Sequence, residues 1–183
     1  MLASSTLVWA ALSLDASASH SGRWLLAGVI ASWIGDALLL PPGKGRLFQT
    51  GIVAFLATHV FYFIALTRTP LSLESWAVGG GVAALTAVVV VRWLRPYVTG
   101  SFRVAVPAYV CAITVMLAAA IARTAEGGAI TIVLGGVMFV ASDCLVARDR
   151  FVKESFGNLA WALPLYFAGQ LFLIWGIQSV ADV

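Results

Sequence analysis

Seven long apolar stretches follow one another along this chain, and only short links separate them. Most of the stretches approach the roughly 20 residues that an α-helix needs to cross a bilayer. The links carry charges or turn sequences such as Pro41-Pro42-Gly43. We therefore expect an all-α, polytopic transmembrane bundle of about seven spans, which forms a single integral-membrane domain over residues 1–183. The expected spans are Leu2–Leu14, Trp24–Leu40, Leu47–Leu66, Trp76–Trp93, Val104–Ala122, Ala129–Ala147 and Leu159–Val180.

The composition excludes a soluble monomer. Hydrophobic residues make up 61% of the chain and charged residues only 10%, which is too little polar surface to cover a globular domain in water. The first stretch leaves one alternative open, because the segment 15–19 after it resembles a signal-peptidase site. The basic residues that normally precede the apolar part of a signal peptide are missing, so we favour a helix that stays in the protein.

Basic residues alternate between the links, and their distribution predicts the orientation in the membrane. The links after the second, fourth and sixth stretches hold eight Lys and Arg residues, whereas the other three links hold three. Cytoplasmic loops carry an excess of Lys and Arg. We therefore expect Met1 and the three basic links in the cytoplasm, Val183 outside, and the protein in the cell (inner) membrane.

Two acidic residues, Asp36 and Asp143, lie inside apolar stretches. Each is a few residues from the cytoplasmic end of its stretch, so the two carboxylates are expected at the same depth. An ionisable residue within a span usually faces the interior of the bundle and indicates a functional site. A purely structural cap or interhelical hydrogen bond is the alternative, and two residues at matched depth make it less favoured. We take Asp36 and Asp143 as a candidate pair.

The third stretch carries five residues at helical spacing. Phe48, Gly51, Phe55, His59 and Tyr62 follow one another in steps of three or four, which places them on one face of a helix. This stripe is expected to face protein, because His and Tyr deep in a span are costly to expose to lipid. Helix packing alone also explains such a stripe, but His59 and Tyr62 favour a polar cavity.

The chain also contains a weak internal repeat in the spacing of its polar residues, which we call the internal echo. His59 follows Asp36 by 23 residues, and Tyr166 follows Asp143 by the same number. The second and sixth stretches run in the same direction in the expected topology. The echo therefore predicts two similar helical hairpins, related by an axis along the membrane normal.

Taken together, these motifs resemble the YhhN-like lysoplasmalogenase family, from the second stretch onward. Members of this family are polytopic membrane proteins, and characterised ones hydrolyse the vinyl-ether bond of lysoplasmalogens to an aldehyde and a glycerophospho-base. Relatives usually have eight spans, so we expect this chain to lack the first of them, either as a short member or through an internal start. The motifs that carry the resemblance are Gly35-Asp36-x-Leu38, the stripe from Phe48 to Tyr62, Pro107-x-Tyr109, Phe139-x-x-Ser142-Asp143-x-Leu145 and Tyr166-x-x-x-Gln170.

The resemblance implies a reaction that needs one acid and one anion. Protonation of the vinyl ether gives an oxocarbenium ion, which water attacks, and two carboxylates divide such work in glycoside hydrolysis. Asp36 and Asp143 are the expected catalytic pair, with His59 to orient one of them or to move protons. Nothing in the sequence says which Asp is the acid. We expect five further residues to bind the glycerol or phosphate oxygens, namely Tyr62, Tyr109, Ser142, Tyr166 and Gln170.

Other functions remain open at this stage. A small-solute or proton-coupled transporter, or a non-catalytic lipid-binding membrane protein, would also place Asp, His and Tyr inside a bundle. Cys111 and Cys144 lie in apolar stretches without the spacing of a metal site, so we expect no metal, no cofactor and no disulfide. The expected partners are a lysophospholipid substrate and membrane lipid, with no nucleic acid, and the sequence leaves the oligomeric state open.

Overall fold

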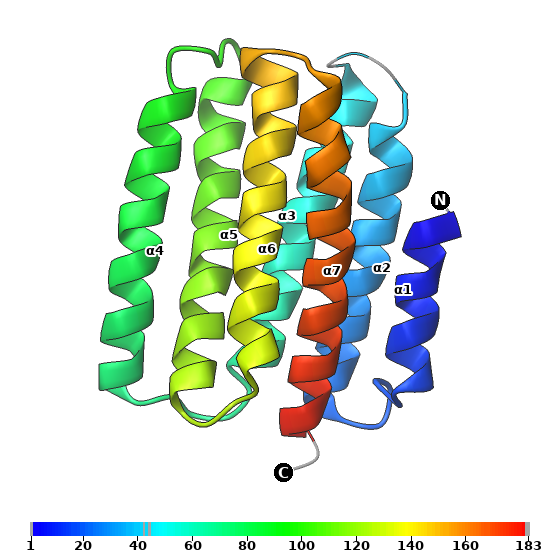
Figure 1. The fold of residues 1–183 in the computed structure, drawn as a ribbon, viewed down its shortest axis with the longest axis vertical. Helices are drawn as coiled ribbons and strands as arrows, with labels where there is room; N and C mark the ends of the chain where they lie inside the picture. Colours follow the sequence, from blue (N-terminus) through cyan, green and yellow to red (C-terminus); the bar gives the residue numbers. More distant parts are fainter. Residues whose placement is uncertain (1, 42, 44, 182–183) are drawn as a thin grey trace.

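The computed structural model describes residues 2–41, 43 and 45–181. Every regular element in these ranges is helical, and the helices run up and down as one bundle (Figure 1), which confirms the predicted all-α polytopic membrane fold. Met1 and Val183, for which the sequence predicts opposite sides of the membrane, lie outside the described residues. The elements are α1 (Leu2–Ser13), α2 (His20–Leu39), α3 (Arg46–Leu66), α4 (Leu73–Leu94), α5 (Phe102–Ala125), α6 (Ile130–Ala147), the π-helical turn η1 (Arg148–Val152) and α7 (Phe156–Ala181).

Within the described residues, six of the seven α-helices are long and apolar enough to cross a membrane. The exception is α1, whose 12 residues extend for only about 18 Å at the usual rise per residue. Several helices also begin earlier than the apolar stretches that predicted them. α2, for example, begins at His20 rather than Trp24, because the Ser19 hydroxyl accepts a hydrogen bond from the Gly22 amide at 2.9 Å and caps the helix in the polar link.

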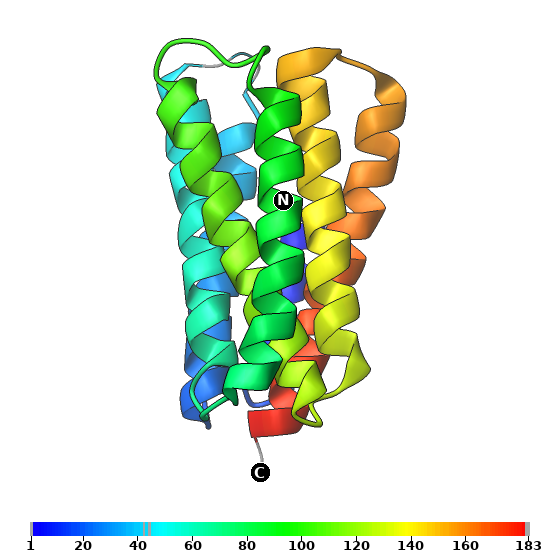
Figure 2. The same ribbon diagram turned by 90° about the vertical axis from the view of Figure 1, so that its left-hand side faces the viewer.

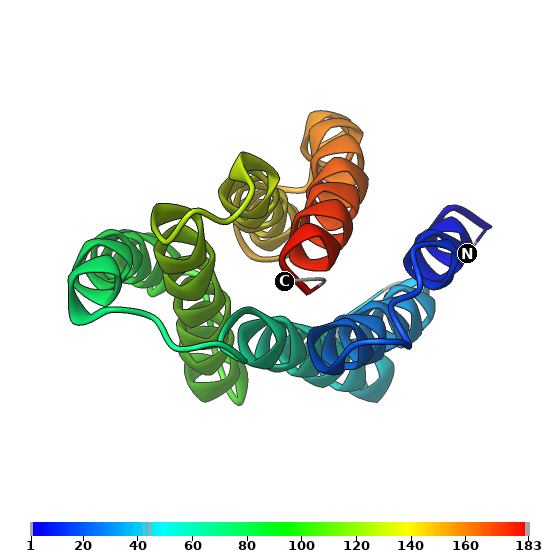
Figure 3. The ribbon, with the colours of Figure 1, turned by 90° about the horizontal axis from the view of Figure 1, so that it is seen from below.

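Five helices form a closed ring. α2 packs on α3, α3 on α5, α5 on α6, α6 on α7, and α7 returns to α2. Figure 3, which looks along the bundle, shows this ring. α4 lies at the edge of the molecule in Figure 1 and in front in Figure 2, and it packs on α5. The short helix α1 covers the outer side of the contact between α2 and α7. The ring contains the helices that carry Asp36, His59, Tyr109, Asp143 and Tyr166.

The stripe on α3 faces protein, as its spacing predicts. All five of its residues are buried, and Phe55 and Tyr62 fit against glycines of α2. A Cβ on Gly28 would lie 2.4 Å from the Tyr62 ring, and a Cβ on Gly35 would lie 2.7 Å from the Phe55 ring. Because α2 lacks side chains at these two places, α3 can approach it closely enough to turn Phe55 and Tyr62 into the ring.

Two neighbouring glycines of α4 provide a test of the packing between α4 and α5. A Cβ on Gly79 would lie 2.3 Å from the Ala118 carbonyl oxygen, whereas a Cβ on Gly80 meets no atom within 4 Å. We predict that Gly79→Ala lowers the free energy of unfolding by about 1–3 kcal/mol, the usual effect of overpacking, and that Gly80→Ala does not. Thermal denaturation of both variants in detergent measures the difference. Equal melting temperatures would show that the close approach of α4 to α5 contributes nothing to stability.

Candidate active site

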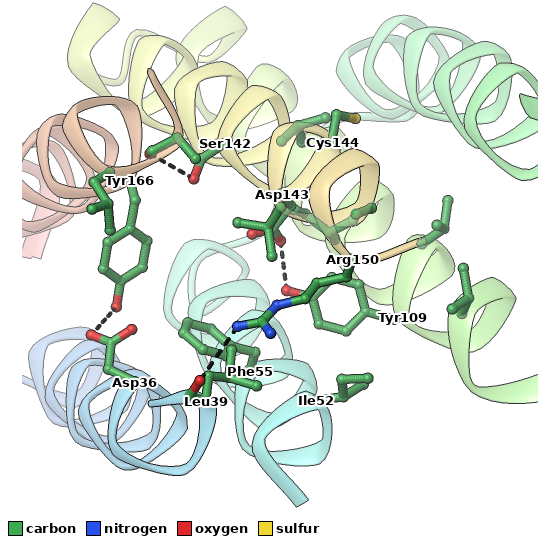
Figure 4. A pocket seen from close by; sticks show the side chains of 18 of the residues that line it. Asp36, Leu39, Ile52, Phe55, Tyr109, Ser142, Asp143, Cys144, Arg150 and Tyr166 are labelled. Atoms are coloured by element: carbon green, nitrogen blue, oxygen red, sulfur yellow. Dashed lines mark hydrogen bonds between the residues drawn. The ribbon is translucent and has the colours of Figure 1, made fainter. Parts of the chain in front are cut away.

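A cavity of about 580 Å³ opens within the ring, at the end of the bundle that carries the three basic links. The C-terminal ends of α2, α4 and α6 and the N-terminal halves of α3, α5 and α7 line it. Most lining side chains are apolar, and the polar ones include the carboxylates of Asp36 and Asp143 (Figure 4). Small-molecule sites in proteins occupy about 300–1,000 Å³, so the cavity can hold a ligand or part of a lipid.

Asp36 enters this cavity from the last turns of α2. The Tyr166 hydroxyl on α7 donates a hydrogen bond to its Oδ2 atom at 2.9 Å, and the Ser4 hydroxyl on α1 donates to the same oxygen. Figure 4 shows Asp36 and Tyr166 together on one side of the cavity. Ser4 is buried and lines the cavity, so α1 is part of the site although it is shorter than the six candidate spans.

Asp143 lies on α6, on the other side of the cavity, and the Tyr109 hydroxyl on α5 donates to its Oδ2 atom at 2.5 Å. His59 Nε2 lies 3.0 Å from this hydroxyl and 3.4 Å from the same carboxylate oxygen. A tyrosine hydroxyl has one hydrogen, which here goes to Asp143, so we assign the proton of the neutral imidazole to Nε2. His59 therefore contacts Asp143 both directly and through Tyr109.

The two carboxylates take their partners from opposite hairpins. Asp36 of the α2–α3 hairpin bonds with Tyr166 of the α6–α7 hairpin, and Asp143 of the second hairpin contacts His59 of the first. These are the four residues of the internal echo, with the partners exchanged. The two hairpins of the echo thus contact each other across the cavity, and α2 and α6 run in the same direction (Figure 1).

A second polar cluster lies behind the cavity wall. The Tyr62 hydroxyl donates to the Gln170 side-chain oxygen, and the Gln170 amide donates to the Ser32 hydroxyl at 2.8 Å. All three residues are almost completely buried. Each end of Gln170 is therefore satisfied by protein, and the cluster joins α3, α7 and α2.

The residues predicted from the sequence fall into these two groups. Asp36, Tyr109, Ser142, Asp143 and Tyr166 line the cavity, although the Ser142 hydroxyl donates to the Ala162 carbonyl. The other three predicted residues do not line the cavity, namely His59, Tyr62 and Gln170. Within the described residues, no group of three His, Cys, Asp or Glu side chains is placed to hold a metal ion.

Sequence reasoning missed two lining residues, Ser4 and Arg150. Ser4 gave no signal, because it belongs to a short apolar stretch with two adjacent serines and no aromatic or charged neighbour. Arg150 was counted only as a basic residue of a cytoplasmic link. Its position in η1, just beyond the end of α6, turns its side chain into the mouth of the cavity (Figure 4).

Gln170 provides a test of the buried cluster. Replacing it with Ala leaves the hydroxyls of Tyr62 and Ser32 without this partner in a region that water does not reach. We predict that Gln170→Ala lowers the free energy of unfolding by about 1–3 kcal/mol. Gln49→Ala, on the exposed start of the neighbouring helix α3, should lower it by less than about 0.5 kcal/mol. Chemical denaturation in detergent checks both values, and equal stability of the two variants would contradict the structural role of Gln170.

Comparison with known proteins gives relatives over most of the chain. A protein of Mycobacterium bovis named lysoplasmalogenase is 30% identical over 172 residues, which cover 91% of this chain and 63% of that protein. Lysoplasmalogenase TMEM86A of Bos taurus is 29% identical over 162 residues, covering 84% of this chain and 64% of its own length. The human protein of the same name is 27% identical over 162 residues, covering 85% and 65%.

The chain thus spans less than two thirds of the length of these curated relatives. No solved structure matches it. The model of the YhhN family matches residues 1–177. The match includes every residue of the cavity described above and agrees with the resemblance seen in the motifs. Because it extends over nearly all of the 183 residues, the chain belongs to the YhhN family.

Proposed function

We propose that this chain is a membrane hydrolase that cleaves the vinyl-ether bond of lysoplasmalogens and releases an aldehyde and a glycerophospho-base. The observation that carries the proposal is the placement of two hydrogen-bonded carboxylates, Asp36 and Asp143, in one cavity with mainly apolar walls. The name of the curated relatives, lysoplasmalogenase, adds support from their sequence similarity. A lysophospholipid in the membrane is the proposed partner.

The surroundings of the two carboxylates suggest how they divide the work. Besides the Tyr109 hydroxyl, Asp143 has the Nε2–H group of the neutral His59 imidazole within 3.4 Å, and N–H and O–H donors aimed at a carboxylate stabilise its charge. Asp36 has only the neutral hydroxyls of Ser4 and Tyr166 as hydrogen-bond partners in the described part of the chain. We therefore assign Asp36 as the acid and Asp143 as the anion of the pair.

The reaction follows from this assignment. Protonated Asp36 transfers its proton to the vinyl carbon remote from oxygen, and the positive charge moves to the carbon bonded to oxygen. Asp143 stabilises this oxocarbenium ion and then accepts a proton from the water that attacks it. The resulting hemiacetal collapses when Asp143 gives its proton to the leaving glycerol oxygen and Asp36 takes the proton of the hemiacetal hydroxyl, which releases the aldehyde and the free alcohol of the glycerophospho-base and restores both carboxyls. Overall, one water molecule is consumed and one carbon–oxygen bond is broken.

The remaining site residues hold and orient the pair in this proposal. Tyr109 and Tyr166 face the cavity, where their hydroxyls can also contact the glycerol oxygens of a bound lipid, and Ser142 lies beside them. His59 orients Tyr109 and Asp143 from behind. Tyr62 and Gln170, which the sequence placed among the substrate-binding residues, act through the buried cluster that joins α2, α3 and α7.

Substitution of the carboxylates tests the proposal. Purified protein in detergent should release free aldehyde from lysoplasmalogen, which neither a transporter nor a lipid-binding protein would do. We predict that Asp36→Asn and Asp143→Asn each lower turnover at least about a hundredfold, the scale of general acid–base catalysis. The turnover of the double variant should be close to that of the less active single variant, because the pair acts as a unit. Asp15→Asn, in the exposed turn between α1 and α2, is the matched control and should keep full activity.

The pH dependence separates the roles of the two carboxylates. Because the proposed reaction needs Asp36 protonated and Asp143 ionised, the rate should follow a bell-shaped profile in pH. Asp143→Asn should remove the rising limb and Asp36→Asn the falling limb. The opposite pattern would exchange the two roles. A larger defect in His59→Gln than in either Asp variant would give the acid role to histidine, and full activity with a flat profile in Asp36→Asn would reject the pair.

We also propose that the three basic links face the cytoplasm and that the protein lies in the cell (inner) membrane. The proposal rests on the excess of Lys and Arg in these links and on their position at one end of the bundle, next to the mouth of the cavity. A lipid of the cytoplasmic leaflet would then enter beside the carboxylates.

Reporter fusions test this orientation. Fusions after Arg46, Arg95 and Lys153 should all report a cytoplasmic location, because each of these residues lies in or directly beside one of the basic links. A fusion after Arg68, between α3 and α4, is the control and should report the opposite side. External signals at two of the first three sites would reverse the orientation but leave the geometry of the cavity unchanged.

A further inference from the structure

Arg150 places a guanidinium at the mouth of the cavity with few partners of its own. Its Nη2 atom lies 3.4 Å from the Leu39 carbonyl, at the long end of the hydrogen-bond range, and its guanidinium lies over the Phe48 ring, 5.4 Å from the centroid. Its Nε atom is buried and has no partner in the described part of the chain. The Arg150 guanidinium therefore has N–H donors available for a ligand at the entrance of the mainly apolar cavity.

The neighbouring residues of η1 are held in a different direction. The Asp149 carboxylate is buried and accepts hydrogen bonds from the Ser155 amide at 2.9 Å and the Asn158 side chain at 3.1 Å. Arg148 donates to the Asn158 side-chain oxygen. These bonds fix the link between α6 and α7, so that Arg150 alone of the three faces the cavity. π-Helical turns occur often at functional sites, where they re-aim a side chain in this way.

The charge of Arg150 is not neutralised inside the protein. Among the described residues, the one ion pair within 4.0 Å is that between His59 and Asp143, so Arg150 has no carboxylate partner. A partly buried guanidinium without an anion is unfavourable, and its planar set of donors fits phosphate oxygens in a two-pronged arrangement. The mouth of the cavity is thus prepared for an anion, and in particular for a phosphate group.

The axial separation between Asp143 and Arg150 is comparable to the length of a lysophospholipid head. Asp143 and Arg150 are seven residues apart along α6 and η1, which is about 10 Å along the helix axis. In a lysoplasmalogen, the glycerol backbone separates the phosphate from the vinyl ether. The flexible Arg150 side chain can adjust for any difference between this spacing and the axial separation of Asp143 and Arg150. The apolar lining, which includes Val110, Val140 and Phe167, is left for the alkenyl chain.

We propose that Arg150 binds the phosphodiester of the lysophospholipid at the cavity mouth and so determines that the substrate carries a phosphate. The proposal deepens the proposed function and rests on it. A guanidinium bound to the phosphate fixes the polar end of the lipid, and the vinyl ether then lies between Asp36 and Asp143. Arg150 takes no part in proton transfer, so its contribution is to substrate affinity.

Two substrates with the same alkenyl chain test this role, one a lysoplasmalogen and the other an alkenylglycerol without phosphate. Arg150→Gln should raise the KM for the lysoplasmalogen roughly ten- to hundredfold, the effect of losing charge-assisted hydrogen bonds, and leave kcat within about twofold. The kcat/KM for the alkenylglycerol should not change. Arg150→Lys should give an intermediate KM, because it keeps the charge but loses the planar set of donors. Lys153→Gln, which removes an exposed charge from the same link, should behave like wild type.

A binding measurement separates failure of this inference from failure of the proposed function. Wild-type protein should bind a saturated alkyl lysophosphocholine, which contains no vinyl ether, more tightly than the matching alkylglycerol. Arg150→Gln should abolish that preference, while millimolar inorganic phosphate should not compete with the lipid. Preference without aldehyde release would reject the hydrolase and keep the phosphate site. Equal losses with both lipids, unchanged binding in Arg150→Gln, or competition by inorganic phosphate alone would overturn the inference.

Discussion

A bilayer interior offers no water to a charged side chain, so each polar group placed there needs a partner inside the protein. In this chain the requirement falls most heavily on Asp36 and Asp143. The Tyr166 hydroxyl of α7 satisfies the first, and the Tyr109 hydroxyl of α5 satisfies the second, with His59 of α3 behind it. Because each carboxylate is bound from another helix, these bonds also fix how the five helices of the ring stand around the cavity.

The same arrangement divides the cavity into regions of different chemistry. Two carboxylates with their tyrosines form a polar centre, Arg150 brings a positive charge to the mouth, and aliphatic and aromatic side chains cover most of the remaining wall. A lysophospholipid has a matching order of groups, with a phosphate, a short glycerol backbone and a long apolar chain. The proposed substrate therefore meets a suitable environment at each part of its length.

Close packing makes this arrangement possible. Glycines of α2 let the aromatic residues of α3 enter the ring, and Gly135 of α6 lies against Gly169 of α7, where a Cβ would meet the Gly169 carbonyl oxygen at 2.7 Å. Both hairpins thus use small residues to bring their helices together. The hairpins then exchange partners across the cavity, so that neither carboxylate is satisfied within its own hairpin.

The sequence by itself determined the helices, the buried face of α3 and the positions of Asp36 and Asp143 near the C-terminal ends of their helices, because hydrophobic length and helical spacing are local properties. It could not determine which hydroxyl meets which carboxylate, since Asp36–Tyr166 and Tyr62–Gln170 join residues more than a hundred positions apart. It also could not reveal the part of α1 or of Arg150 in the cavity. Ser4 gave no pattern, and the direction of Arg150 depends on the π-helical turn and on the bonds of Asp149 that hold it. These contacts arise only when the helices pack, because tertiary structure alone decides which polar groups share one enclosed space.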